Sequence, residues 1–252
     1  MQRLFDSWNE VRSRLRSARA IALFLDFDGT LARLRAAPPD VSVDRSLRQE
    51  LCMIVRSSRF RVWVVSGRRR SDVRERLAVR GIRYLGLHGW ERRAGARLAE
   101  EGRSSLECVR RILGGVLVNH PSIWVEDKEY ALTLHHRAAP PDVRRASLAS
   151  IAAVLEPFGS VLRISAAKYS WEIIPRELED KGVAVRRELA ALASGSTPVY
   201  VGDDVVDEPA FAALASGITI RVGPCGPTRA RYFLRDVGEV RTFLRKLHTD
   251  MR

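Results

Sequence analysis

Five short apolar runs rich in β-branched residues recur along the chain, and stretches with helical spacing of apolar residues separate them. Continuous apolar runs of this length are typical of strands buried on both faces of a parallel sheet. The predicted strands are 20–26, 61–66, 82–87, 198–203 and 217–222. The predicted helices are 3–17, 44–57 with Asp44 as its N-cap, 70–79, 181–193, 207–215 and 237–248. Strands that alternate with helices predict a doubly wound, Rossmann-like α/β core with a parallel sheet.

The middle of the chain follows a different pattern. Its predicted order is helix, strand, strand, helix, strand, strand, over residues 104–118, 122–127, 129–137, 141–156, 160–165 and 169–174. Strands joined by short hairpins are antiparallel, so they do not belong in the parallel sheet of the flanks. We therefore expect an inserted α+β cap domain (α-β-β-α-β-β) at 104–173, acting as a lid. The catalytic core would be formed by 1–103 and 174–252.

The net charge of +13 raises the question of an anionic partner. The arginines, however, are spread along the whole chain, and we find no DNA-reading motif and no basic strip interleaved with aromatic residues. A nucleic-acid partner is therefore not what we expect. The lysines are more informative about possible functional sites. Only four of the 43 basic residues are lysines, and each is a candidate for a site that needs a compact ammonium group. They are Lys128, Lys168, Lys181 and Lys246.

The rest of the composition indicates the class of protein and its location. Apolar residues make up 46% of the 252 residues, which is enough for a packed core. The longest apolar stretches are far short of a membrane span, and the first 19 residues lack the apolar block of a secretory signal. Cys52, Cys108 and Cys225 are widely spaced and odd in number, which predicts neither a disulfide framework nor a zinc site. We expect a cytoplasmic protein that does not enter membranes.

Two acids follow the first predicted strand. Asp26 and Asp28 are two positions apart, and such residues on a strand point to the same side. Two carboxylates this close repel each other unless a cation lies between them. Asp203, Asp204 and Asp207 offer further oxygen ligands at the end of another predicted strand. A set of oxygen ligands favours Mg²⁺ over Zn²⁺.

Smaller motifs lie at the same strand ends and at one helix start. Each alone has an ordinary structural explanation, since Asp-Gly and Ser-Gly pairs are common in turns and a lysine that starts a helix is usually solvated. Together, at the ends where ligands bind in such cores, they predict a metal-dependent phosphoryl site. The residues concerned are Gly29, Thr30, Ser66, Gly67, Arg68 and Lys181.

The order of these motifs resembles a known superfamily. DFDGTLA, VVSGR, DKGVAV and VYVGDDVVDE are similar to the four ordered motifs of the haloacid dehalogenase superfamily of phosphatases. Three further segments, HGWERR (88–93), VEDKEYALTLHHR (125–137) and WEIIP (171–175), resemble those of the trehalose-6-phosphate phosphatase family. The similarity covers nearly the whole chain, with departures from the family pattern at Trp90, His136 and Val206.

The resemblance implies roles for the core residues. Asp26 would be the nucleophile that forms an aspartyl-phosphate, and Asp28 would be the general acid and then the general base. Ser66 and Lys181 would bind phosphate oxygens and stabilise the developing charge. The remaining expected substrate contacts of the core are Gly29, Thr30, Gly67 and Arg68. Magnesium would be held by Asp26, the Asp28 carbonyl, Asp203 and Asp204, with Asp207 supporting these ligands from behind.

The alternation along the predicted cap strands points to a sugar pocket. If Leu132, Leu134 and Ile173 face the cap helices, then the neighbouring polar residues face the opposite way. The same alternation predicts that Ile123 and Val125 are buried. The candidate sugar contacts are Glu126, Lys128, His135, Arg137 and Glu172. An ordinary solvated sheet face is the alternative.

These observations lead to one main functional hypothesis and three alternatives. We expect a magnesium-dependent phosphatase that hydrolyses trehalose 6-phosphate to trehalose and phosphate. A related enzyme for sucrose phosphate or glucosylglycerate phosphate, a basic nucleic-acid-binding protein, and a silent regulatory subunit are the alternatives. The intact acids and lysine argue against the last of these. We also expect a monomer that is functionally coupled to a trehalose-6-phosphate synthase.

Overall fold

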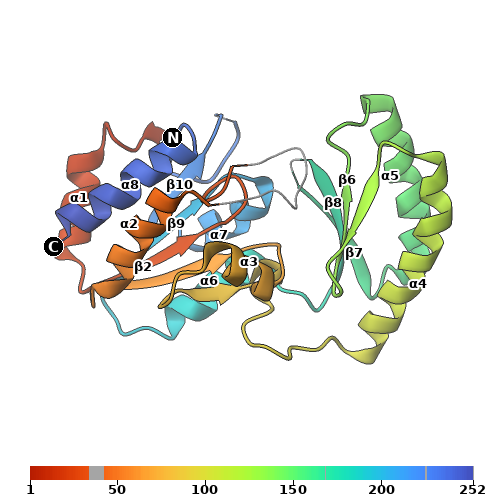
Figure 1. Ribbon diagram of the computed structural model, residues 1–252, viewed down its shortest axis with the longest axis horizontal. Helices are drawn as coiled ribbons and strands as arrows, with labels where there is room; N and C mark the ends of the chain where they lie inside the picture. The colour runs from red at the N-terminus through yellow and green to blue at the C-terminus, as the bar shows by residue number, and fades with distance from the viewer. Residues whose placement is uncertain (34–42, 168, 225, 252) are drawn as a thin grey trace. The chain divides into compact units, whose positions relative to one another are not determined.

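The computed structural model describes residues 1–33, 43–167, 169–224 and 226–251 (Figure 1). Contacts between residues divide the chain into two compact units. The larger unit comprises Met1–Ala94 and Asp180–Arg252, and the smaller unit comprises Gly95–Glu179. The smaller unit is wider than the range 104–173 expected from the sequence, because the segments that connect it contact it rather than the larger unit.

The larger unit contains a seven-stranded sheet in the order β1-β11-β10-β9-β2-β3-β4, and all of its strand pairs are parallel. The strands are β1 Gln2–Arg3, β2 Ala20–Leu25, β3 Phe60–Val65, β4 Arg83–Leu85, β9 Ser196–Gly202, β10 Ile218–Val222 and β11 Tyr232–Leu234. From β2 the chain proceeds outward to β3 and β4, and it later proceeds from β9 the other way to β10 and β11. The boundary between β2 and β9 is therefore the switch point at which such sheets bind ligands.

Helices cover both faces of this sheet, because side chains alternate along the buried strands. Ile21, Leu23 and Leu25 of β2 belong to the hydrophobic cluster shared with α1, α2, α3 and α8, while Ala22 and Phe24 belong to the cluster shared with α6 and α7. The helices are α1 Trp8–Ser17, α2 Arg45–Arg56, α3 Arg70–Leu77, α6 Lys181–Ala190, α7 Glu208–Ala213 and α8 Val237–Asp250. This arrangement confirms the predicted doubly wound α/β core.

Two short strands were not expected from the sequence. Arg3 was assigned to a helix over 3–17, but Gln2–Arg3 form a strand that pairs with Tyr232 and Phe233 at the edge of the sheet, and the helix begins at Trp8. Segments of two or three residues are too short to carry a periodic signal, so the pairing partner decides their conformation.

The smaller unit has the predicted order α-β-β-α-β-β. Its elements are α4 Glu100–Val116, β5 Trp124–Asp127, β6 Leu132–His135, α5 Pro141–Leu155, β7 Leu162–Ala166 and β8 Ser170–Pro175. The strands form an antiparallel sheet in the order β5-β6-β8-β7. Leu132, Leu134 and Ile173 are fully buried in a cluster with residues of α4 and α5, as the alternation predicted.

One expected burial in this unit is wrong. Val125 is 37% exposed, although it pairs with the buried Leu134. The reason is its position on β5, which lies at the edge of the sheet and has a neighbour on one side. Ile123, the other residue expected to be buried, is 5% exposed.

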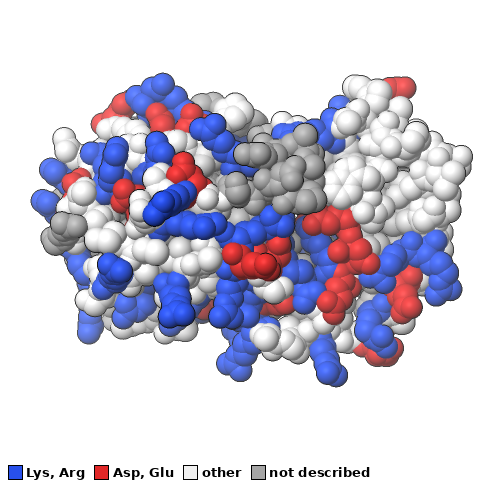
Figure 2. Space-filling view, viewed as in Figure 1, with Lys and Arg blue, Asp and Glu red and all other residues white. Residues whose placement is uncertain are grey.

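The surface is rich in arginine but not of one sign. Figure 2 shows Lys and Arg side chains spread over the visible face of the molecule, with Asp and Glu side chains among them. Within the part of the chain that the structure describes, no helix combines the length and the apolar character needed to cross a membrane.

The N-cap of α8 provides a test of the larger unit. The Asp236 carboxylate accepts from the Glu239 N–H at 3.0 Å, and α8 buries Val240, Phe243, Leu244 and Leu247. Asp236→Ala should lower the free energy of unfolding by about 1 kcal/mol, while Asp236→Asn, which keeps an acceptor, should lower it by only a few tenths. Urea denaturation measures both values, and equal losses would contradict the capping role.

Candidate active site

The site begins where three parallel strands end. β2 pairs with both β3 and β9, so that the residues after these strands emerge at one edge of the sheet. The Asp26 N–H donates to the carbonyl of Val201 at 2.9 Å, which extends the β2–β9 pairing by one residue. The Ser66 N–H donates to the carbonyl of Leu85 at 3.0 Å and extends the β3–β4 pairing in the same way. Asp26, Ser66 and Asp203 therefore lie at the ligand-binding edge that the sequence predicted.

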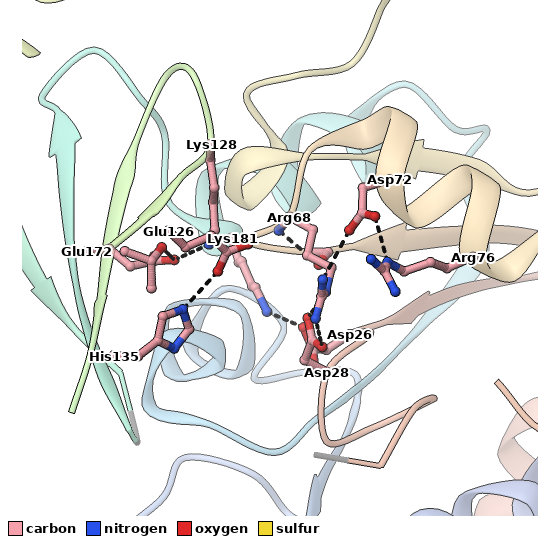
Figure 3. A network of polar contacts seen from close by, with 12 residues as sticks. Asp26, Asp28, Arg68, Asp72, Arg76, Glu126, Lys128, His135, Glu172 and Lys181 are labelled. Atoms are coloured by element: carbon pink, nitrogen blue, oxygen red, sulfur yellow. Dashed lines mark hydrogen bonds and ion pairs between the residues drawn. The ribbon is translucent and has the colours of Figure 1, made fainter. Parts of the chain in front are cut away.

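A buried ammonium joins two of the acids. Lys181 Nζ lies 2.6 Å from Asp26 Oδ1 and 2.7 Å from Asp207 Oδ1 (Figure 3 shows the contact with Asp26). Lys181 is 1% exposed, and it is the first residue of α6, whose N-cap Asp180 accepts from the Val183 N–H at 2.8 Å. The start of the helix thus fixes the backbone of Lys181, and the two carboxylates fix its ammonium group.

Negative charge exceeds positive charge around this lysine. Asp26, Asp203 and Asp207 are 5%, 4% and 0% exposed, and each offers an oxygen within 4.8 Å of the others. Burial raises the pKa of Asp26 to about 8; the ammonium of Lys181 works against this rise, and the charge of Asp207 adds to it. The site thus sets three buried carboxylates against one ammonium, and a further cation between them would lower the pKa of Asp26.

The acidic triad fits a magnesium ion. Its three ligands are carboxylate oxygens, which Mg²⁺ prefers, and no softer ligand is among them. The structure brings Asp207 to Asp26 and Asp203, whereas the sequence placed Asp204 in the metal set and Asp207 behind it. Asp204 is half-buried, and its carboxylate accepts from the Val205 N–H at 2.6 Å as the N-cap of the short 3₁₀ helix Val205–Asp207.

Tyr200 holds Asp207 in place from within the sheet. Its hydroxyl donates to Asp207 Oδ1 at 2.7 Å, and its ring is fully buried on β9. Asp207 Oδ2 accepts from the Asp204 N–H at 3.0 Å. Both oxygens of Asp207 are therefore held by donors, which fixes the carboxylate that faces Lys181.

Asp28 is paired with an arginine rather than with the lysine. Arg68 donates from Nε to Asp28 Oδ2 at 2.6 Å and from Nη2 to Asp28 Oδ1 at 2.8 Å. This is a bidentate, charge-assisted pair, the strongest form of such a contact. The Asp28 side chain is 29% exposed, so the second acid of the motif lies closer to solvent than Asp26.

The hydroxyls expected to contact phosphate are buried. Ser66 is 1% exposed, and its Oγ accepts from the Arg68 N–H at 3.1 Å. Thr30 is fully buried, and its Oγ1 has no hydrogen-bond partner among the described residues. A buried hydroxyl without a partner is costly, and it suits a ligand oxygen. Gly67 lies half-buried between Ser66 and Arg68.

Gly29 has a different task from the one expected. Gly29 was expected to contact the substrate, but its N–H donates to the carbonyl of Ala32 at 2.7 Å. Its φ is +85°, and a Cβ at this position would lie 2.2 Å from Asp203 Oδ2. Glycine is thus required because the loop after β2 passes directly against the carboxylate of Asp203.

The cap candidates form a polar group of their own within the smaller unit. Glu126 pairs with Thr133 and Thr133 with Glu172, so the three residues form one row across β5, β6 and β8. Lys128 Nζ lies 2.8 Å from Glu172 Oε1, and Thr133 Oγ1 lies 3.3 Å from the same oxygen. The side chains of Lys128 and Glu172 are 9% and 7% exposed, so this ion pair is largely buried (Figure 3).

A second row lies at the other end of the same sheet. His135 Nε2 lies 2.8 Å from Glu126 Oε2, and the His135 ring stacks on Trp124 with 4.0 Å between the centroids. Arg137 is exposed, and its guanidinium lies 4.2 Å from the centre of the Tyr169 ring. All five predicted cap residues therefore belong to contacts on the polar side of the sheet or just beyond it.

Three residues in these networks were missed from the sequence. Tyr200 lies in a buried strand, where periodicity carries no information about a hydroxyl. Trp124 begins an edge strand, where an aromatic residue has no fixed environment. Asp72 contacts Arg68. It could have been singled out from the sequence, because Asp72 and Arg76 are opposite charges four residues apart on the predicted helix 70–79.

Comparison with known proteins agrees with this geometry. The trehalose-phosphatase family model matches residues 24–237. A probable trehalose-phosphate phosphatase of Oryza sativa subsp. japonica is 30% identical over 273 residues, covering 92% of this chain and 70% of the relative.

Two solved structures share the fold. The C-terminal domain of the C. albicans trehalose-6-phosphate phosphatase is 20% identical with a TM-score of 0.82, covering 95% of this chain and 96% of that one. A haloacid dehalogenase-like hydrolase from Bacteroides thetaiotaomicron is 16% identical with a TM-score of 0.62, covering 90% of this chain and 99% of that one. The resemblance predicted from the motifs is thus confirmed, and the chain belongs to the trehalose-phosphatase family, which has a haloacid dehalogenase-like fold.

Proposed function

We propose that this protein is a magnesium-dependent phosphatase that hydrolyses trehalose 6-phosphate to trehalose and inorganic phosphate. The observation that carries the proposal is the buried Asp26, held at 2.6 Å by Lys181 at the switch point of the sheet. A desolvated carboxylate with a fixed cation beside it suits nucleophilic attack on a phosphoryl group.

In the first step, an oxygen of Asp26 attacks the phosphorus and the bond from phosphorus to the sugar oxygen breaks. Asp28 gives its proton to the departing sugar oxygen, so trehalose leaves as a neutral alcohol. Lys181, Ser66 and Thr30 would stabilise the charge on the phosphoryl oxygens. The buried Thr30 hydroxyl without a partner supports this assignment.

In the second step, Asp28 takes a proton from a water molecule, and the water oxygen attacks the phosphorus of the aspartyl-phosphate. The bond between phosphorus and the Asp26 oxygen breaks, which releases inorganic phosphate and restores the carboxylate. The exposure of Asp28 is greater than that of Asp26, which supports its role as the residue that meets water.

Asp26, Asp203 and Asp207 would hold the magnesium ion, together with the carbonyl of Asp28. When bound, the ion neutralises charge on the phosphoryl oxygens and on the acids around it. The property of this chain that supports a cation at this place is the convergence of three buried carboxylates, whose oxygens lie within 4.8 Å of one another.

The smaller unit would supply specificity as a cap. Glu126, Lys128, His135, Arg137 and Glu172 offer donors and acceptors that suit the hydroxyl groups of a sugar. A disaccharide phosphate other than trehalose 6-phosphate, such as sucrose phosphate or glucosylglycerate phosphate, would differ in these contacts alone. A cytoplasmic location, a monomeric state and coupling to a trehalose-6-phosphate synthase remain predictions from the sequence.

A panel of phosphorylated sugars tests the proposed reaction. Phosphate release should be greatest with trehalose 6-phosphate, and it should disappear in Asp26→Asn, because an amide is a poor nucleophile. The circular dichroism spectrum of Asp26→Asn should match the wild type. A folded Asp26→Asn that releases phosphate at the wild-type rate would exclude Asp26 as the nucleophile, and a greater rate with another sugar phosphate would change the substrate.

Thermal unfolding tests the metal site without relying on turnover. At 100 times its dissociation constant, Mg²⁺ should stabilise the fold by about 2.7 kcal/mol, which raises Tm by roughly 5–10 °C. Asp203→Asn should lose this shift. Asp204→Asn should keep it if the ligand set is Asp26, Asp203 and Asp207, and should lose it if Asp204 is a ligand as the sequence predicted.

Variants of the smaller unit test the sugar pocket. Glu126→Gln and Glu172→Gln should lower kcat/KM for trehalose 6-phosphate roughly ten- to a hundredfold, as expected for loss of a charged hydrogen-bond partner worth about 1.5–3 kcal/mol. Turnover of p-nitrophenyl phosphate, which has no sugar, should change less than about twofold. Glu107→Gln, at an exposed position of α4, is the matched control. Equal losses on both substrates would show that the pocket residues serve the fold.

A further inference from the structure

One guanidinium in the larger unit is shared by two carboxylates. Arg68 donates from Nε and Nη2 to both oxygens of Asp28, and from Nη1 to Asp72 Oδ2 at 3.1 Å. The Arg68 side chain is 9% exposed. Figure 3 shows Arg68 between Asp28 on one side and Asp72 on the other.

The second carboxylate is itself held. Asp72 lies in the first turn of α3, and its Oδ1 accepts from Nε of Arg76, one helical turn further on, at 2.6 Å. Arg68 precedes α3, which begins at Arg70, so Asp72 connects this helix to a side chain outside it. Its position is determined by the helix, while that of Arg68 is determined by what it contacts.

The geometry of a guanidinium makes this connection effective. Its N–H groups lie in one plane, so a contact at Nη1 restricts rotation of the plane that presents Nε and Nη2. A bidentate contact in turn restricts the carboxylate that accepts it. Arg68 therefore restrains the Asp28 carboxylate, and Asp72 is one of the groups that restrain Arg68.

We propose that Asp72 is a positioning residue for the acid–base carboxylate of Asp28 and acts through Arg68. The inference rests on the proposed function, in which Asp28 gives a proton to the sugar oxygen and later takes one from water. Both transfers require one Asp28 oxygen at a fixed place, and small misplacements of a reacting group lower the rate of the chemical step strongly. Asp72 itself touches neither substrate nor phosphate in this account.

A purely structural role for Asp72 makes a different prediction. An acid in the first turn of a helix stabilises that helix, and an Asp–Arg pair four residues apart adds a little more. If that is its whole role, its removal lowers Tm slightly and leaves turnover unchanged. Glu75 lies on the same helix and is exposed, so it reports the effect of removing an acid from α3.

The first experiment compares Asp72→Asn with Glu75→Gln. Asp72→Asn should lower kcat roughly ten- to a hundredfold with both trehalose 6-phosphate and p-nitrophenyl phosphate, with KM changed less than about twofold. Glu75→Gln should leave both constants within about twofold of the wild type. A kcat of Asp72→Asn equal to that of Glu75→Gln would overturn the inference. Absence of phosphatase activity in the wild type would instead overturn the proposed function.

The second experiment tests whether Arg68 carries the effect. In an Arg68→Lys background, where a single ammonium replaces the fork, Asp72→Asn should lower kcat no further, because coupled residues are not additive. A full additional loss would show that Asp72 acts by another route.

A magnetic resonance measurement gives a readout that needs no turnover. The Nε–H proton of Arg68 can be assigned by its loss in Arg68→Lys. Its rate of exchange with solvent should be higher in Asp72→Asn than in the wild type, and the rate in Glu75→Gln should equal that of the wild type. Exchange in Asp72→Asn at the wild-type rate would overturn the inference, whatever the activities of the variants.

Discussion

A carboxylate without water around it needs cationic partners, and Asp26 occupies such a place. The position of Lys181 follows from this requirement, since its ammonium must reach both Asp26 and Asp207. The face of the sheet that carries α6 and α7 is arranged to make this reach possible. A Cβ on Gly182 would lie 2.5 Å from the carbonyl oxygen of Pro209, so the starts of the two helices are in close contact. Removal of the Lys181 ammonium would leave Asp26 and Asp207 buried without this cation, which is destabilising, whereas Lys181 keeps Asp207 as a partner when Asp26 is neutralised.

The two acids of the first motif are two residues apart, but the structure gives them different surroundings. Asp26 is buried and faces a lysine, whereas Asp28 is partly exposed and faces an arginine. Burial raises the pKa of Asp26, while solvent can reach Asp28. One environment suits a nucleophile that is activated by desolvation, and the other suits a group that exchanges protons with water. The difference in burial thus supports the two separate roles that we propose for these acids.

The sequence predicted what depends on chain periodicity, and it missed what depends on side-chain reach. The buried strands and the acids at their ends were predictable because parallel strands end at a common edge. The sequence placed Asp204 among the metal ligands and Asp207 behind it, but the short helix Val205–Asp207 brings Asp207 rather than Asp204 to Asp26 and Asp203. Gly29 was expected to contact the substrate, but its N–H closes the loop on the carbonyl of Ala32, a contact that no sequence pattern indicates. Val125 was expected inside because alternation does not tell an edge strand from a central one.

The two junctions between the units have a consequence for the exchange of caps between enzymes. The chain leaves the larger unit after Ala94, three residues beyond Glu91, whose carboxylate accepts from the Arg70 N–H at 2.7 Å at the start of α3. It returns at Asp180, the N-cap of the helix that begins with Lys181. Each junction is therefore anchored next to a residue to which we assign a part in catalysis, Arg68 or Lys181. A foreign cap inserted by recombination can replace the segment between these anchors, but a crossover that removes Glu91 or Asp180 also disturbs the helix starts that position Arg68 and Lys181. If the smaller unit sets the specificity as proposed, exchange of whole caps changes the substrate only within the limits that these two acidic residues set.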